Sequence, residues 1–99
     1  MIVDFADKET RDIYDGVRSK RAIKRLHPDS WPKAQRLLDQ LNRVTRLEMM
    51  NIPPNNRLHK LKGSRAGQWA VWITASHRLV FRWTGTDARD VEIVDYHDE

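Results

Sequence analysis

Two of the four histidines lie among residues that could help them move protons. His97 ends the run Asp95-Tyr96-His97, and His59 opens a basic stretch. Imidazole can act as a general acid or a general base because its pKa lies near neutrality. The histidines show no metal-ligand spacing such as His-x-x-x-His, and the sequence contains no cysteine. The pattern therefore predicts neither a metal site nor a thiol nucleophile.

The sequence also lacks a glycine-rich phosphate loop and a serine in a nucleophile elbow. We therefore expect no nucleotide cofactor and no other cofactor. RNA cleavage requires neither metal nor cofactor, because the 2′-hydroxyl can attack the adjacent phosphate. A catalyst removes the 2′ proton, neutralises charge on the phosphate oxygens and protonates the departing 5′ oxygen. Converging His, Tyr, Asp, Arg and Lys side chains could do this; alternatively, Asp95-Tyr96-His97 is a polar strand end that meets solvent.

Positive charge is concentrated in the middle of the chain. The net charge is +4, but residues 17–65 carry 13 basic and three acidic side chains. Such a concentration is typical of a protein that binds a polyanion. A solvated helix face or a surface for an acidic protein partner remain alternatives. The candidate RNA-binding residues in the densest stretch are Arg18, Lys20, Arg21, Lys24 and Arg25.

A second basic strip runs from His59 to Arg65. Leu58 and Leu61 are expected to anchor it to the core, which would turn its basic side chains outward. The strip is predicted to contact phosphates through Lys60, Lys62 and Arg65, and its alternative is a solvated basic loop.

The helices that must support these residues are predicted in the first half of the chain. Asp7 can cap a helix from Glu9 to about Tyr14, which Gly16 would end. Residues 17–26 have too few apolar positions to define a helix. Apolar residues recur with helical spacing over 31–46, with Ser30 as the expected N-cap.

The strands are predicted at the start and in the second half of the chain. Residues 2–5 could form an edge strand, and 69–74, 78–83 and 91–96 should form an antiparallel meander with the helices packed on one face. Alternation puts Asp95 and His97 on one face of the last strand and Tyr96 on the other. Arg78 begins the neighbouring strand. The expected class is α+β, in one domain over residues 1–99.

Four segments together resemble the HigB toxins of the RelE-like superfamily of bacterial toxin–antitoxin systems. The segments are residues 56–63 (NRLHKLKG), 67–71 (GQWAV), 77–83 (HRLVFRW) and 90–97 (DVEIVDYH). The resemblance implies a compact RelE-like fold with a small, mostly antiparallel sheet and two or three helices on one face. It implies an endoribonuclease, or mRNA interferase, that cuts mRNA in the ribosomal A site and inhibits translation.

The resemblance also suggests roles for particular residues and for partners. Asp95, Tyr96 and His97 match the C-terminal site of the family, His59 matches an active-site histidine of some members, and Lys62 and Arg78 match basic residues near the scissile phosphate. The implied partners are a HigA-like helix-turn-helix antitoxin, the ribosome with its mRNA, and operator DNA through the antitoxin only.

A second function remains open. Relatives in the superfamily poison DNA gyrase, and a degenerate member would bind only its antitoxin, so a non-catalytic interaction protein is the alternative.

The acidic start of the chain does not resemble a signal peptide, and no apolar run approaches the roughly 20 residues of a membrane span. A cytoplasmic location without a membrane partner is therefore expected.

Overall fold

The helices lie in the first half of the chain and the longer strands in the second half. The computed structural model describes residues 1–96. The α-helices are α1 (Lys8–Asp15), α2 (Lys20–Arg25) and α3 (Trp31–Arg43). The strands are β1 (His59–Lys60), β2 (Trp69–Trp72), β3 (His77–Trp83) and β4 (Ala88–Asp95), and short 3-10 turns lie between α2 and α3 and between α3 and β2.

Local capping sets the ends of α1, as the sequence predicts. The Asp7 side chain accepts a hydrogen bond from the Thr10 backbone N–H at 2.8 Å. Gly16 follows the helix with φ 75°, a left-handed conformation that glycine adopts without a Cβ clash. The N–H of Gly16 then donates to carbonyl oxygens of the last turn.

The chain after Gly16 forms α2, where the spacing of apolar residues did not define a helix. The hydroxyl of Ser19 accepts from the Ala22 backbone N–H at 3.2 Å and donates to an Asp12 carboxylate oxygen at 2.8 Å. Ala22 is fully buried. A cap and one small buried residue therefore hold this six-residue helix against α1.

Helix α3 differs from the prediction at both ends. Ser30 makes no capping hydrogen bond, because it lies in a 3-10 turn with helical backbone angles, whereas a capping residue needs an extended backbone. The helix ends at Arg43 and not at residue 46. Val44 is extended and buried, and the Gln40 side-chain amide donates to the Met49 and Ile52 carbonyls, which holds the chain reversal.

The sheet is antiparallel, with strand order β1-β2-β3-β4. It adds β1, which opens the predicted basic strip, to the predicted meander. Strand β2 ends at Trp72, two residues before the predicted end, and β4 runs from Ala88 to Asp95. The predicted edge strand at residues 2–5 is reduced to two isolated parallel bridges to β4, Ile2 to Ala88 and Phe5 to Val91.

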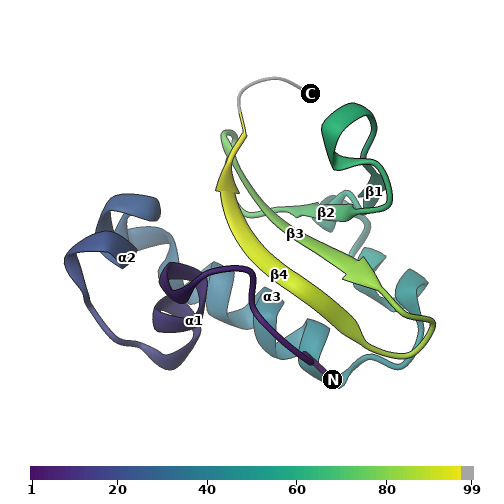
Figure 1. Ribbon diagram of the computed structural model, residues 1–99, viewed down its shortest axis with the longest axis horizontal. Coiled ribbons are helices and arrows are strands. Elements are labelled where there is room, and N and C mark those ends of the chain that lie inside the picture. The colour runs from purple at the N-terminus through teal and green to yellow at the C-terminus, as the bar shows by residue number, and fades with distance from the viewer. Residues whose placement is uncertain (97–99) are drawn as a thin grey trace.

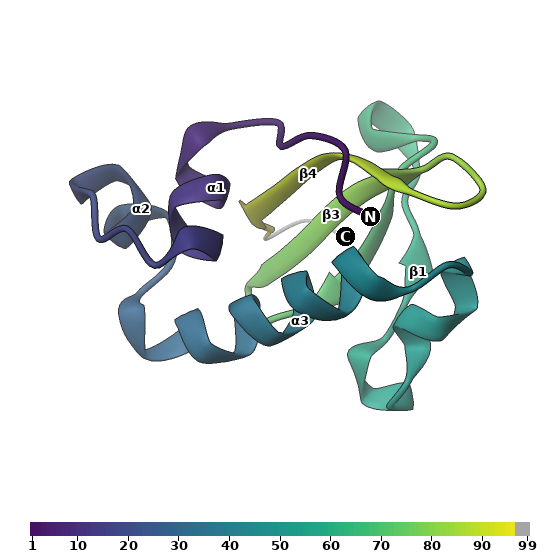
Figure 2. The same ribbon diagram turned by 90° about the horizontal axis from the view of Figure 1, so that it is seen from below.

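The three α-helices pack on one face of the sheet, as predicted. Figures 1 and 2 show α3 running along this face, with α1 and α2 together at one end. The sheet contributes to this main core through Val71, Ile73, Leu79, Phe81, Val91 and Ile93. The opposite face carries a smaller buried cluster of Leu61, Ala70, Val80 and Val94, against which Tyr96 packs. Within residues 1–96, every helix is too short or too polar to cross a membrane.

Candidate functional site

Three of the predicted catalytic residues share the sheet face that lies opposite the helices, which we call the open face. Residues paired directly across a sheet point to the same side. One row of pairs is His59, Ala70, Val80 and Glu92, and the next is Trp72, Arg78 and Val94. Tyr96 joins this face by packing on the cluster of Leu61, Ala70, Val80 and Val94.

The strand geometry sets how closely His59 and Arg78 approach. They lie two strands and one row of side chains apart. Strand spacing of about 4.8 Å and a rise of about 3.3 Å per residue place their Cα atoms roughly 12 Å apart. Two long side chains that lean toward each other can span such a distance together with a bound phosphate. The sheet thus supports one site made from residues that are distant in sequence.

Arg78 is the most deeply buried charged residue of this face, with 3% of its surface exposed. Its Nη1 donates to the carbonyl oxygens of Thr74 at 2.8 Å, His77 at 3.2 Å and Ala75 at 3.3 Å, all in or beside the β2–β3 turn. Its guanidinium carbon also lies 3.8 Å from the centre of the Trp72 ring. These contacts fix the orientation of the guanidinium in advance, as stabilisation of a phosphate charge requires.

His59 is held by the residue two positions before it. Its Nδ1 lies 2.8 Å from the Arg57 carbonyl oxygen. Because a carbonyl oxygen can only accept, Nδ1 carries the proton, and Nε2 is the basic nitrogen of the neutral ring. The ring is half-buried on β1, so its tautomer is set by the backbone rather than by solvent.

Asp95 and Tyr96 lie on different faces of the sheet. The Tyr96 backbone N–H donates to the Ser76 carbonyl oxygen at 2.6 Å and its ring joins the open face. Asp95 pairs with His77 and points to the helix side, where it lines a hollow of about 290 Å³ with Glu9, Arg21, Lys24 and Arg25. The predicted separation of Asp95 from Tyr96 is therefore confirmed. His97 lies outside the described residues, so its predicted place beside Asp95 stays a prediction.

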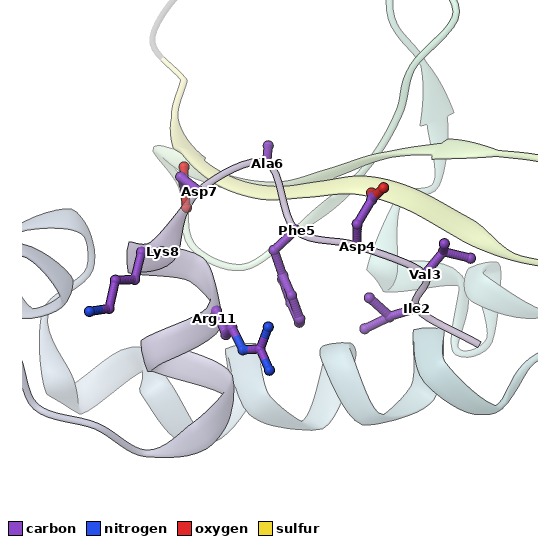
Figure 3. Close-up of a pocket in the computed structure, with 8 residues that line it drawn as sticks. All are labelled: Ile2, Val3, Asp4, Phe5, Ala6, Asp7, Lys8 and Arg11. Carbon is purple, nitrogen blue, oxygen red and sulfur yellow. The ribbon is translucent and has the colours of Figure 1, made fainter.

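A larger hollow lies elsewhere. It has a volume of about 730 Å³ and is formed by residues 2–8 and Arg11. Figure 3 shows Ile2 and Phe5 pointing from the N-terminal segment toward the helix layer, where both pack against the main core. None of the predicted site residues lines this hollow. The open face is the better candidate, because it carries side chains of the types that metal-free RNA cleavage would need.

The basic segment divides into one structural residue and a group of exposed ones. Arg25 donates to Asp7 at 2.7 Å, to Glu9 at 3.0 Å and to the Ile93 carbonyl at 2.7 Å. It ties α2 to α1 and to β4. Burial opposes ionisation of Asp7, but hydrogen bonds from Arg25 and Thr10 outweigh it and hold the pKa of Asp7 below its usual value. Arg25 therefore has an internal role, and its predicted RNA contact stays a prediction.

The other members of the segment remain on the surface. Lys20, Arg21 and Lys24 are exposed and have no carboxylate within 4.0 Å among residues 1–96. The Arg18 guanidinium is also exposed, 5.9 Å from the centre of the Trp31 ring. The positive charges of these four side chains are therefore accessible to a polyanion.

The strip from His59 to Arg65 is less uniform than predicted. Lys62 is exposed, as expected. Lys60 is exposed but pairs with Trp69 on the other side of β1 from His59, with its Nζ 5.9 Å from the Trp69 ring centre. The Arg65 guanidinium is drawn to Glu92 at 3.4 Å. Of the three, Lys62 alone has neither a carboxylate nor a ring partner among residues 1–96, and it stays a candidate RNA contact.

Sequence reasoning missed Arg57 as a site residue. Its guanidinium carbon lies 4.2 Å from the centre of the Trp72 ring, so two guanidiniums meet one indole. Each contact of this kind contributes roughly 0.5–2 kcal/mol. The one signal in the sequence was that Arg57 lies two residues before His59. The turn-forming residues before Arg57 gave no indication that a strand begins at His59. The Trp72 ring thus contacts both arginines.

Comparisons with known proteins place the chain in a family. A YoeB/ParE toxin from Agrobacterium tumefaciens superposes with a TM-score of 0.49 and 25% sequence identity, over 89% of this chain and 90% of that one. An endoribonuclease HigB from Proteus vulgaris is 39% identical over 41 residues, which are 41% of this chain and 45% of that protein. The match thus spans less than half of the relative. A family model described as the RelE-like toxin of type II toxin-antitoxin system HigB matches residues 3–97. The chain therefore belongs to the HigB-like family of RelE-like toxins.

Proposed function

We propose that this toxin is a ribosome-dependent endoribonuclease that cuts mRNA in the A site and so stops translation. The observation that carries the proposal is the open face, which gathers Arg78, His59 and Tyr96 around a small apolar floor. The family supports a toxin, and the relative from Proteus vulgaris is named an endoribonuclease. A HigA-like helix-turn-helix antitoxin would be the partner that neutralises it.

The reaction would use side chains alone. The 2′-hydroxyl attacks the adjacent phosphorus, the bond to the 5′ oxygen breaks, and a 2′,3′-cyclic phosphate and a 5′-hydroxyl result. Arg78 would neutralise charge on the phosphorane oxygens, because its guanidinium is already oriented by three carbonyls. Lys62 is exposed and would also contact the RNA. Protons would pass through His97 and Tyr96. The orienting role predicted for Asp95 is not part of this step, because Asp95 points to the helix side. His59, whose Nε2 is the basic nitrogen, would be a further proton acceptor.

The exposed cations of the basic segment would act on a different part of the target. Arg18, Lys20, Arg21 and Lys24 lie on or just before α2, at the end of the molecule away from β1. Together they supply more positive charge than one scissile phosphate requires. We assign them to phosphates of ribosomal RNA, where each would contribute to a salt-dependent affinity.

Primer extension on a translated message tests the proposal. His97→Ala should lower the cleavage rate by about 10²–10⁴-fold, as loss of a positioned acid or base does. Tyr96→Phe should lower it less, because the ring that packs on Val94 is retained. The matched control is His27→Ala, which removes an exposed histidine before α3 and should leave cleavage unchanged.

Three outcomes would contradict the proposal. Cuts at the full rate from the His97→Ala protein would remove this residue from the mechanism. An induced wild-type protein that halts DNA replication before translation, and leaves translated messages uncut, would favour the non-catalytic alternative. Equal cutting of a message without a start codon would show that the ribosome is not required.

A further inference from the structure

Two arginines from distant parts of the chain meet on one aromatic ring of the open face. The ring belongs to Trp72 on β2. The guanidinium carbons of Arg78 and Arg57 lie 3.8 Å and 4.2 Å from its centre. At these separations the planar cations stack on the indole rather than merely approach its edge.

Arg57 differs from Arg78 in being exposed. Within residues 1–96, its guanidinium has no carboxylate partner within 4.0 Å and donates no hydrogen bond to protein. Stacking uses the flat face of a guanidinium and leaves its N–H edge to point outward. Arg57 thus presents several donors in a fixed plane, which is the geometry that matches two oxygens of a phosphate.

The backbone conformation of Arg57 also helps to place its side chain over Trp72. Its φ is 55°, a left-handed value that is uncommon for a residue with a side chain. Its carbonyl oxygen accepts from Nδ1 of the candidate catalytic residue His59. One residue therefore orients an imidazole through its backbone and places a cation through its side chain.

The exposed guanidinium of Arg57 offers its charge to an anion at this place on the open face. A phosphate is a suitable anion, because two of its oxygens can accept from one guanidinium edge. In a strand of RNA, consecutive phosphates are separated by one nucleotide, so a second phosphate contact beside Arg78 fits a chain that crosses the open face.

We propose that Arg57, stacked on Trp72 beside Arg78, binds the RNA phosphate next to the one that reacts. Arg57 touches the substrate, and Trp72 is a positioning residue that holds both guanidiniums. This inference rests on the proposed ribonuclease function and names a contact within that site. It makes Arg57 a determinant of substrate binding and leaves the proton transfers to other residues.

Single-turnover cleavage on ribosomes programmed with a defined A-site codon tests the inference. Toxin concentration is varied, and each variant gives a half-saturating concentration and a maximal rate. Arg57→Gln should raise the half-saturating concentration about tenfold, as loss of a charge-assisted phosphate contact does, and change the maximal rate less than about threefold. The matched control is Arg46→Gln, which removes an exposed arginine whose partner is Glu48 and should change neither quantity.

Substitutions of Trp72 separate positioning from a general loss of structure. Trp72→Leu should raise the half-saturating concentration and also lower the maximal rate, because both guanidiniums lose their ring. Trp72→Phe should restore much of each, since an aromatic face remains. In the Trp72→Leu background, Arg57→Gln should add little further loss, because the two residues act through one contact. Circular dichroism of each variant checks that the fold is intact.

The outcomes distinguish a failure of the role of Arg57 from a failure of the proposed ribonuclease function. A wild-type protein that does not cut the programmed message would overturn both. A wild-type protein that cuts, together with an Arg57→Gln variant that behaves like Arg46→Gln, would overturn only the role of Arg57. Equal defects in Trp72→Leu and Trp72→Phe would show that the ring does not act through its aromatic face.

Discussion

The two faces of the sheet are built from the same strands but meet different surroundings. On the helix side, Leu79, Phe81 and Ile93 join a core to which all three α-helices contribute. On the open face, Val80 and Val94 belong to a cluster of four buried residues, and the partly buried Tyr96 completes it. The first face holds the molecule together by burying apolar surface. The open face has a small apolar cluster, and the polar side chains of the candidate site surround it.

Two arginines show the same contrast in their contacts. Arg25, on the helix side, pairs with the carboxylates of Asp7 and Glu9 and so joins α2 to α1. Arg78, on the open face, donates to three carbonyl oxygens in or beside the β2–β3 turn and lies on an indole ring. The contacts of Arg25 thus join two helices, whereas these contacts of Arg78 orient its guanidinium within the candidate site.

Truncation of the main core should give the largest effect. Phe81 is fully buried on the helix side. Phe81→Ala should lower the free energy of unfolding by about 3–5 kcal/mol, from lost burial and the remaining cavity. Val94→Ala, on the open face, should cost about 1 kcal/mol because fewer atoms and fewer neighbours are lost. Urea denaturation followed by circular dichroism measures both, and equal losses would contradict the contrast between the faces.

Removal of Arg25 should come next. Arg25→Ala leaves Asp7 and Glu9 close together without their cation, and the side chain of Arg25 is 24% exposed. We expect a loss of about 2–3 kcal/mol, less than for a fully buried pair because water reaches the site. Arg21→Ala, in the same helix but exposed, should change stability by less than about 0.5 kcal/mol. A thermal melt in which the two variants coincide would refute the structural role of Arg25.

The smallest effect should be a pH dependence from Asp7. Because its pKa in the folded protein is below the usual 3.8, the stabilisation from its charged form is complete above that value. It is lost as the pH falls through the lower, folded-state pKa. Asp7→Asn should therefore lose less stability than the wild type between about pH 5 and about pH 3. Urea midpoints at several pH values measure this, and parallel curves for the two proteins would exclude the assignment.

Sequence patterns predicted the elements whose determinants are local. The cap at Asp7, the end of α1 at Gly16 and the alternation along β3 and β4 all depend on residues within one turn or one strand, and all are present. Helix α2 and strand β1 were missed because they are short, and their stability comes from contacts with other elements. Alternation also separated Asp95 from Tyr96 correctly, since it requires only the direction of successive side chains.

The sequence by itself determined the α+β class, the split of the strands into a core face and a polar face, and the candidates Arg78, His59 and Tyr96. Only the tertiary structure decided which charges serve the fold and which remain for a ligand. Arg25 is bound to a carbonyl 68 residues away, and Arg57 lies over the ring of Trp72, which Arg78 also contacts. Charge and periodicity describe a residue and its near neighbours. The partner of a long side chain depends on which distant segments the packed core brings beside it.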